Sequence, residues 1–341
     1  MARLISSKVA SAIATILGAS ILSFVLLRVL PGDPARLIAG PLASDTAVEG
    51  VIRKLGLDQP IHIQYIRYIT DFFRGDWGFS FTAGQPVREV LGSRFPATVE
   101  LALYAFSFAF VAALFLALFA TYRDWPVVDG LVRAISSLGL GTPPFWFALI
   151  ALIVFFEELR LLPGPSGRLG MATTPPPAIT GLFTVDALLA GEFGKFAEAL
   201  RHLVLPAISL GFVPFAFLVR LLRANLLEVS REPFIIVVRS KGIGPWLTHV
   251  RHALPNAFLP TLTASGLILA ELLAGSVLVE KIFTWPGIGS LVVDSILRQD
   301  YVVVQAFILL SAFVYVLVNL VVDILYGVID PRTRIPATEA S

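Results

Sequence analysis

Six long apolar runs constrain the fold of this chain more than any other feature of its sequence. A run of about 18 or more apolar residues can cross the hydrocarbon core of a bilayer as a helix. Only Glu271, in the fifth run, interrupts one of them with a charge. Prolines in the third and fourth runs do not exclude helices, because neighbouring helices in a membrane bundle can satisfy the freed backbone groups. The runs lie between residues 8 and 28, 100 and 123, 133 and 157, 202 and 220, 253 and 279, and 301 and 322.

The composition agrees with this pattern. Only 15% of the 341 residues are charged and 56% are hydrophobic, whereas about 25% of the residues in a typical soluble domain are charged. We therefore predict an all-α polytopic membrane protein with about six transmembrane helices. A cleaved signal peptide is the alternative for the first run, because Arg3 and Lys8 precede it. We favour a retained helix, since the run is longer than a typical signal segment and ends in Arg28 and Pro31 without a small-residue cleavage site.

Lysine and arginine are unevenly distributed between the loops. With six spans both termini lie on one side, where the loops hold 12 of these residues in 66 positions, against 13 in 133 on the other side. Basic residues concentrate in cytoplasmic loops, so both termini are predicted to be cytoplasmic. The predicted organisation is a cytoplasmic N-terminus and first helix over 1–30, an external segment over 31–97, a transmembrane domain over 98–330 with a cytoplasmic loop at 224–255, and a cytoplasmic tail over 331–341.

Two external segments are long enough to fold. Apolar residues from Ile61 to Phe72 recur at helical spacing, which predicts a helix packed on the membrane domain. Residues 163–177 are rich in glycine and proline and are predicted to be irregular, whereas 184–201 could form a short amphipathic helix.

The cytoplasmic loop from Arg220 to His252 has a net charge of +4 and predicts a small folded element. Ser230 is a plausible N-cap, Lys241 suits the last turn, and Gly242 stands where a helix C-cap belongs. Pro245 can open a second short helix that ends near Pro255. The pattern alone leaves two interpretations open: an amphipathic helix on the lipid surface, or a helix that docks in a groove on a partner protein.

Metal chemistry finds little support in this sequence. It contains no cysteine, and His249 and His252 stand three residues apart among basic residues without a carboxylate cluster nearby. We therefore expect no metal site and interpret the two histidines as loop residues.

The chain carries a series of short motifs in a fixed order. They are Leu30-Pro31-Gly32-Asp33-Pro34, Leu55-Gly56-Leu57-Asp58-Gln59-Pro60, Gly75-Asp76-Trp77-Gly78, Arg94-Phe95-Pro96-Ala97-Thr98, Leu162-Pro163-Gly164, Leu205-Pro206-Ala207, Glu280-Lys281-Ile282-Phe283-Thr284-Trp285-Pro286-Gly287-Ile288-Gly289 and Asp330-Pro331-Arg332. This series resembles the membrane subunits of bacterial ABC importers, specifically the dipeptide/oligopeptide permeases of the DppB/OppB type. The order and spacing of the motifs extend over nearly the whole chain, which makes the resemblance specific. It implies a type I ABC importer permease fold with a large external segment after the first helix.

The same resemblance implies a role for the cytoplasmic loop. In such importers this loop carries a coupling helix that inserts into a cleft of the ATPase, and the loop of this chain departs from the family pattern at Pro233-Phe234 and Val237-Val238. The implied partners are a second permease subunit of the DppC/OppC type, two ATPase subunits, an extracytoplasmic substrate-binding protein and membrane lipids, with no nucleic acid. The coupling residues that we assign are Glu228, Phe234, Arg239, Lys241, Gly242 and Arg251.

No catalytic residue is assigned, and the chain is predicted not to be an enzyme. It lacks the G-x-x-x-x-G-K-[ST] phosphate loop, so ATP and magnesium are expected only in the partner ATPases. The resemblance places the protein in the bacterial cytoplasmic membrane. Relatives transport dipeptides, oligopeptides, glutathione, nickel complexes or sugars, and the sequence does not choose among these substrates.

Candidates for the translocation pathway are Glu271, Pro144 and Phe145. The Pro143-Pro144 pair is expected to kink the third run, either beside the pathway or as a plain packing kink. A charge within a span usually faces a bundle interior or an aqueous cavity, although Glu271 could equally be a paired structural carboxylate. Glu280 and Asp323 lie near span ends, and we predict structural roles for them, with water or a basic neighbour satisfying each charge. The alternative functions are a polytopic membrane enzyme, which would need more polar groups at membrane depth, and a secondary transporter, which often has inverted repeats.

Overall fold

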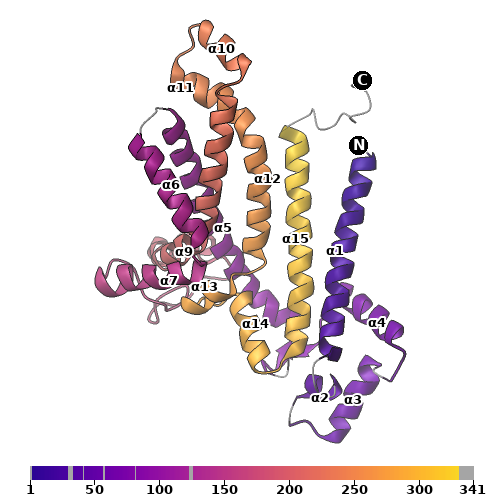
Figure 1. The fold of residues 1–341 in the computed structure, drawn as a ribbon. Helices are drawn as coiled ribbons and strands as arrows, with labels where there is room; N and C mark the ends of the chain where they lie inside the picture. Colours follow the sequence, from indigo (N-terminus) through magenta and orange to yellow (C-terminus); the bar gives the residue numbers. More distant parts are fainter. Residues whose placement is uncertain are drawn as a thin grey trace.

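Long helices run side by side through most of the molecule (Figure 1). The computed structural model describes residues 2–29, 34–40, 42–56, 58–80, 82–122 and 126–329. The predicted tail at 331–341 and the motif Asp330-Pro331-Arg332 lie outside these residues. The elements are α1 (Ala2–Val29), α2 (Pro34–Ala39), α3 (Asp45–Leu55), α4 (Ile61–Phe73), β1 (Phe79–Ser80), β2 (Gln85–Pro86), α5 (Val87–Tyr122), α6 (Pro126–Gly141), α7 (Pro144–Leu152), η1 (Ile153–Glu158), α8 (Phe183–Leu189), α9 (Phe193–Val229), α10 (Pro233–Ser240), α11 (Pro245–Leu247), η2 (Thr248–Ala253), α12 (Leu254–Leu273), α13 (Val277–Ile282), α14 (Ile288–Leu297) and α15 (Tyr301–Ile329).

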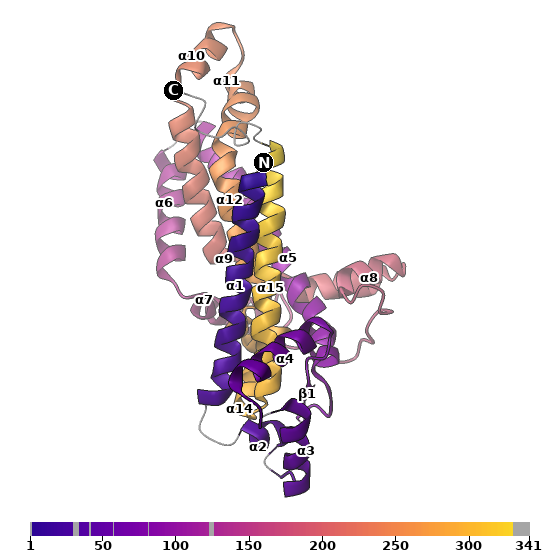
Figure 2. The same ribbon diagram turned by 90° about the vertical axis from the view of Figure 1, so that its right-hand side faces the viewer.

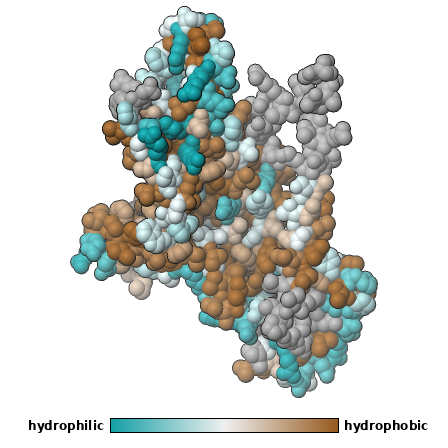
Figure 3. Space-filling view, viewed as in Figure 1, coloured by the Kyte–Doolittle hydropathy of each residue, from teal (hydrophilic) through white to brown (hydrophobic). Residues whose placement is uncertain are grey.

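The helices occupy the positions of the predicted spans. Within the described residues, four helical segments are long and apolar enough to cross a membrane: α5, α9, the continuous helix Pro245–Leu273, and Tyr301–Val322 of α15. The first predicted run forms α1, whose described apolar part is Ala10–Val25. Figure 3 shows a hydrophobic belt between more hydrophilic surfaces at the α10 end and the α3 end, as expected for a membrane bundle.

The third predicted span is not one straight helix. The chain bends by 109° between α6 and the α7–η1 segment, so the kink expected at the Pro143-Pro144 pair is present as a sharp bend. Pro143 takes an extended conformation ahead of α7, and Pro144 occupies its first turn. Neither proline can donate the hydrogen bonds that would continue α6. The segment α7 instead packs across α9, where the Phe147 and Phe212 rings stack 4.0 Å apart.

The two longest helices, α5 and α9, pack closely through small residues. Ala105, Ala109 and Ala113 are almost completely buried on α5. A Cβ atom on Gly211 of α9 would lie only 2.5 Å from the Ala105 carbonyl oxygen. Close backbone approach of this kind is how transmembrane helices associate when the hydrophobic effect cannot drive them together. The α5–α9 pair therefore forms the centre of the bundle.

The external segments are only partly as predicted. The predicted helix over Ile61–Phe72 is confirmed as α4, and residues 163–177 form no helix, also as predicted. Residues 184–201 do not form one amphipathic helix, because α8 ends at Leu189 and 193–201 are the first turns of α9. The α9 span thus begins outside the predicted run.

The two ends of the bundle differ. The segments α10 and α11 project at one end, where α1 begins and α15 ends, and α2, α3 and α14 lie at the other (Figures 1 and 2). Both termini of the helical bundle are thus at the α10 end, as an even number of spans requires.

Candidate ATPase-docking loop and the polar network at the opposite end

The loop predicted to couple to a partner is a short helix held between two long ones. The helix α9 ends at Val229, and Ser230 is its C-cap, so the prediction that Ser230 caps the next helix was wrong. Helix α10 starts instead at Pro233, after Glu232 as N-cap. Proline suits the first turn of a helix, because its fixed φ is helical and the N–H that it lacks would be unpaired there. Gly242 has φ +77°, which confirms the predicted glycine turn after Ser240.

A single side chain anchors α10 to the bundle. Ile235 is 1% exposed and packs in a core cluster with Leu226 of α9 and Ala253 of η2. On the other faces, Ile236 and Val237 are 65% and 54% exposed, and Phe234 is 39% exposed. Ile235 is therefore the fully buried side chain of α10, and the helix presents other apolar side chains outward.

The second helix of the loop does not end near Pro255 as predicted. It continues from α11 through the π-helical segment η2 into α12, with Pro255 in the first turn of α12. His249 and His252 lie within η2, inside the segment predicted as the cytoplasmic loop. His249 is buried, and its Nε2 lies 2.7 Å from the Thr121 hydroxyl, which joins η2 to α5. Trp246 of α11 remains half exposed.

The charged residues assigned to the loop lie on its surface. Glu228 is exposed near the end of α9, Arg239 and Lys241 at the end of α10, and Arg251 on η2. Among the described residues, no ion pair involves any of these four side chains. The loop thus combines an apolar face with basic side chains that are available to a partner.

The proposed pathway residues lie on two different elements. Glu271 is exposed on α12, where the described residues offer it neither an ion pair nor a hydrogen bond. Pro144 and Phe145 are exposed at the start of α7, just after the bend. Phe145 is 40% exposed. All three side chains are therefore open to a neighbour outside this chain.

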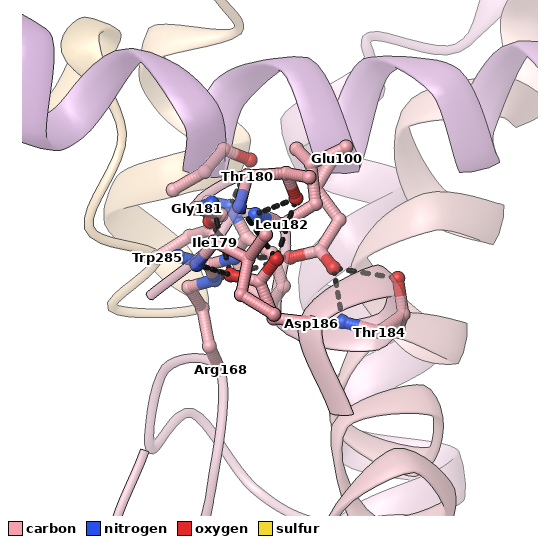
Figure 4. Close-up of polar contacts among 10 residues, drawn as sticks. Glu100, Arg168, Ile179, Thr180, Gly181, Leu182, Thr184, Asp186 and Trp285 are labelled. Atoms are coloured by element: carbon pink, nitrogen blue, oxygen red, sulfur yellow. Dashed lines mark hydrogen bonds and ion pairs between the residues drawn. The ribbon is translucent and has the colours of Figure 1, made fainter. Parts of the chain in front are cut away.

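A buried ion pair, which the sequence alone did not reveal, lies at the opposite end of the bundle (Figure 4). Arg168 donates to Glu100 at 2.6 Å, and the two side chains are only 7% and 2% exposed. Burial lowers the pKa of the Arg168 guanidinium, while the negative charge of Glu100 acts against that shift. Thr184 completes the site by donating its backbone N–H and its hydroxyl to Glu100 at 2.8 and 2.7 Å. The only signal in the sequence was a charge at each place: Glu100 bounds the second run, and Arg168 lies in the irregular segment.

Asp186 organises the turn beside this ion pair. It accepts hydrogen bonds from the backbone N–H groups of Ile179, Thr180 and Gly181 and from the Thr180 hydroxyl. Burial by itself would raise the pKa of Asp186, but these hydrogen bonds outweigh it and hold that pKa below its usual value. Arg168 also donates to the Gly181 carbonyl at 2.7 Å. The irregular segment is therefore fixed to α5 and α8 by polar contacts.

The motifs at 94–98 and 280–289 contact each other in this region, although they are about 180 residues apart in the sequence. Glu280 is completely buried and accepts from the Thr98 hydroxyl at 2.8 Å and the Ser290 N–H at 2.7 Å. Thr98 in turn accepts from the Ile288 N–H at 2.9 Å. A structural role for Glu280 fits these contacts, but its partners are a hydroxyl and a backbone N–H, not the water or basic neighbour that we predicted. The side chain of Asp323 lies outside the described residues.

Trp285 belongs to the same contact. It is 1% exposed, and its indole Nε1 donates to the Ala97 carbonyl at 2.8 Å. The motif Arg94-Phe95-Pro96-Ala97-Thr98 thus forms the start of the second span and also the support for the segment 280–289. These motifs connect the segments at the end of the fold opposite α10.

Comparison with known proteins identifies the family. Residues 109–335 match the family described as binding-protein-dependent transport system inner membrane component, and residues 1–102 match its N-terminal region. This chain belongs to that family. It is a permease subunit of an ABC transporter with the type I permease fold, as the motifs had suggested.

Relatives with assigned names resemble the chain over almost its full length. It is 44% identical to the probable D,D-dipeptide transport system permease protein DdpB of Escherichia coli K12 over 317 residues, 92% of each chain. It is 41% identical to the di/tripeptide transport system permease protein DppB of Pseudomonas aeruginosa over 335 residues, 98% of this chain and 99% of the relative. It is 36% identical to the dipeptide transport system permease protein DppB of E. coli K12 over 337 residues, with the same coverage.

Proposed function

We propose that this permease forms half of the transmembrane pathway of an ATP-driven importer for dipeptides or similarly short peptides. The substrate class comes from the names of the relatives, three of which are permeases for dipeptides or di/tripeptides at 36–44% identity. A second permease subunit would supply the other half. An extracytoplasmic binding protein would deliver the peptide to the end formed by α2, α3 and the segment 159–182.

The observation that carries this proposal is the projection of α10 beyond the ends of α1 and α15 (Figures 1 and 2). An amphipathic helix that lies on lipid would be level with the ends of the membrane helices. The exposed apolar side chains of α10, with Arg239 and Lys241 beside them, instead suit insertion into a groove on another protein. We therefore favour docking of an ATPase subunit over lipid binding, and we keep 224–255 as the bounds of the coupling loop.

This docking fixes the orientation that we propose. An ATPase in the cytoplasm requires α10 to face the cytoplasm, and α1 begins at the same end. The excess of lysine and arginine in the loops of that side supports the same orientation. Both termini are then cytoplasmic, in a bacterial inner membrane.

The second permease subunit would cover the surfaces that a single chain leaves open. Glu271 is an exposed carboxylate within an apolar helix, and a charge at that depth is costly against lipid. A protein interface or an aqueous pathway would remove this cost. We propose that Glu271, Pro144 and Phe145 face the pathway between the two permease subunits.

The test introduces a charge at the docking helix and looks for its partner. Ile236 is 65% exposed, so Ile236→Asp should not disturb folding. Leu42, which is 98% exposed at the opposite end, provides the matched control Leu42→Asp. Each variant is tagged, purified from native membranes in mild detergent, and analysed by mass spectrometry for associated subunits.

The proposal predicts that the unsubstituted protein and Leu42→Asp recover a second permease and ATPase subunits. Ile236→Asp should retain the second permease and lose most of the ATPase. If no ATPase accompanies the unsubstituted chain in several detergents, the importer assignment is wrong, and a secondary transporter or membrane enzyme becomes the better hypothesis. If Ile236→Asp keeps its ATPase, the importer stands but α10 is not the docking helix.

A further inference from the structure

The short helix α4 carries three different stripes along its length. Residues seven apart lie on the same face of a helix. Tyr65 packs inward toward α1. Ile66 and Phe73 lie on the next face of the helix and are 62% and 66% exposed. Arg67 and Arg74 lie on the face after that and are also exposed. The helix thus presents a packed face, an exposed apolar face and a charged face in sequence.

The packed face fixes the depth of α4 along the bundle. The Tyr65 hydroxyl lies 2.6 Å from the Ser20 hydroxyl, and the Tyr68 hydroxyl lies 3.1 Å from that of Ser23. Both serines are completely buried, and both belong to the apolar stretch Ala10–Val25 of α1. The helix therefore crosses α1 beside its apolar stretch, well before α1 ends at Val29 (Figure 2).

Neighbouring residues of α1 indicate what surrounds α4 at this depth. Ile21, Leu22 and Val25 are 51%, 64% and 43% exposed. They lie in the part of a membrane-spanning helix that must be surrounded by acyl chains or by protein. The apolar face of α4, to which Ile63 also contributes at 41% exposure, belongs to the helix that packs on this part of α1.

We propose that α4 is an interfacial helix embedded in the leaflet on the side opposite α10. The side chains of Ile63, Ile66 and Phe73 would contact acyl chains, while Arg67 and Arg74 would face the phosphate headgroups. An interfacial helix combines an apolar face inserted into lipid with basic residues on its polar face. The structural role would be to bind phospholipid around the outer half of α1. This inference depends on the membrane fold and not on the identity of the transported substrate.

The absence of cysteine from the sequence allows a direct test. Single-cysteine variants Ile66→Cys and Phe73→Cys, with Arg67→Cys as the matched control on the same helix, are labelled with a nitroxide. The intact complex is reconstituted in phospholipid vesicles. Electron paramagnetic resonance then measures how accessible each label is to oxygen, which concentrates in the bilayer, and to a water-soluble nickel chelate.

The proposal predicts an oxygen-to-nickel accessibility ratio several-fold higher at positions 66 and 73 than at position 67. Equal ratios at all three positions, with ready access of the nickel chelate, would mean that α4 lies in water and would overturn the proposal. Protection of 66 and 73 from both reagents would also overturn it, because a protein subunit would then cover the apolar face. Co-purification of the labelled chains with their partner subunits is measured separately, so failure here is distinct from failure of the importer assignment.

Discussion

Replacing Arg168 by methionine should loosen the segment 159–182 from the bundle. Methionine is unbranched, apolar and similar in length to arginine, but it leaves the buried carboxylate of Glu100 without its cation. Thr184 would still donate two hydrogen bonds to that carboxylate. The Arg168 guanidinium also lies 3.5 Å from the centre of the Phe183 ring, and this contact would be lost as well.

The expected loss follows from the burial of the pair. Removing one partner of a buried ion pair costs about 3–5 kcal/mol, mainly because the remaining charge is uncompensated. At 2% exposure, Glu100 cannot regain solvation without local opening. Changing Glu100 to glutamine as well removes that charge, so the double variant should recover much of the loss. Replacing both charges of a buried pair is often nearly neutral.

The measurement is a double-mutant cycle with Arg168→Met, Glu100→Gln and the double variant, unfolded by denaturant in mixed micelles. Limited proteolysis of the segment 159–182 reports local opening in the same samples. Arg160→Met is the control, because Arg160 lies on the same segment but is exposed. Additive effects, within about 0.5 kcal/mol, would mean that the two charges do not interact and would refute the reasoning.

Three further predictions concern other contacts. Burial raises the pKa of Glu280 to about 7. The folded state therefore favours the protonated acid. The free energy of unfolding should be highest below the usual glutamate pKa and should fall by about 3 kcal/mol as the pH rises to 7. Glu280→Gln should flatten this dependence in unfolding measured from pH 5 to 8, and an unchanged profile would contradict the assignment. Gly211→Ala should cost about 1–3 kcal/mol through overpacking against α5, whereas Gly92→Ala, where a Cβ meets nothing within 4 Å, should not. Gly242→Ala should add about 1 kcal/mol of backbone strain at φ +77° and so reduce the amount of ATPase that co-purifies with the chain. Gly244→Ala should leave that amount unchanged, because Gly244 has φ −59° and open space around it.

Hydropathy predicted the membrane fold well, because a span must be long and uncharged to cross the bilayer. Helix-end signals were less reliable, since the predicted ends at Ser230 and Pro255 were wrong. Local signals also predicted the glycine turn at Gly242, from its place after the last turn of a helix, and the helix α4, from the spacing of its apolar residues. The Pro143-Pro144 pair predicted a kink between α6 and α7, but the size of the bend could not be predicted, because the apolar run continues through the pair without a change in composition. Hydropathy cannot distinguish a kinked span from two helices at 109° to each other.

Long-range polar contacts were beyond the reach of the sequence pattern. The sequence did not indicate that Arg168 pairs with Glu100, 68 residues away. Each residue taken alone has the pattern of an ordinary charge in a loop or at the end of a span. Glu280 was predicted to be structural, but its partner Thr98 lies 182 residues away. The resemblance of both motifs to one family suggested that each matters, and the fold explains why: they bind each other.

The measurement that tests the central claim most directly is peptide uptake by the purified complex in sealed vesicles, with ATP supplied on the α10 side and the binding protein on the other. The account predicts accumulation of a labelled dipeptide that requires ATP and persists when a protonophore abolishes the proton gradient. Uptake that is indifferent to ATP and lost with the protonophore would contradict it and identify the protein as part of a secondary transporter.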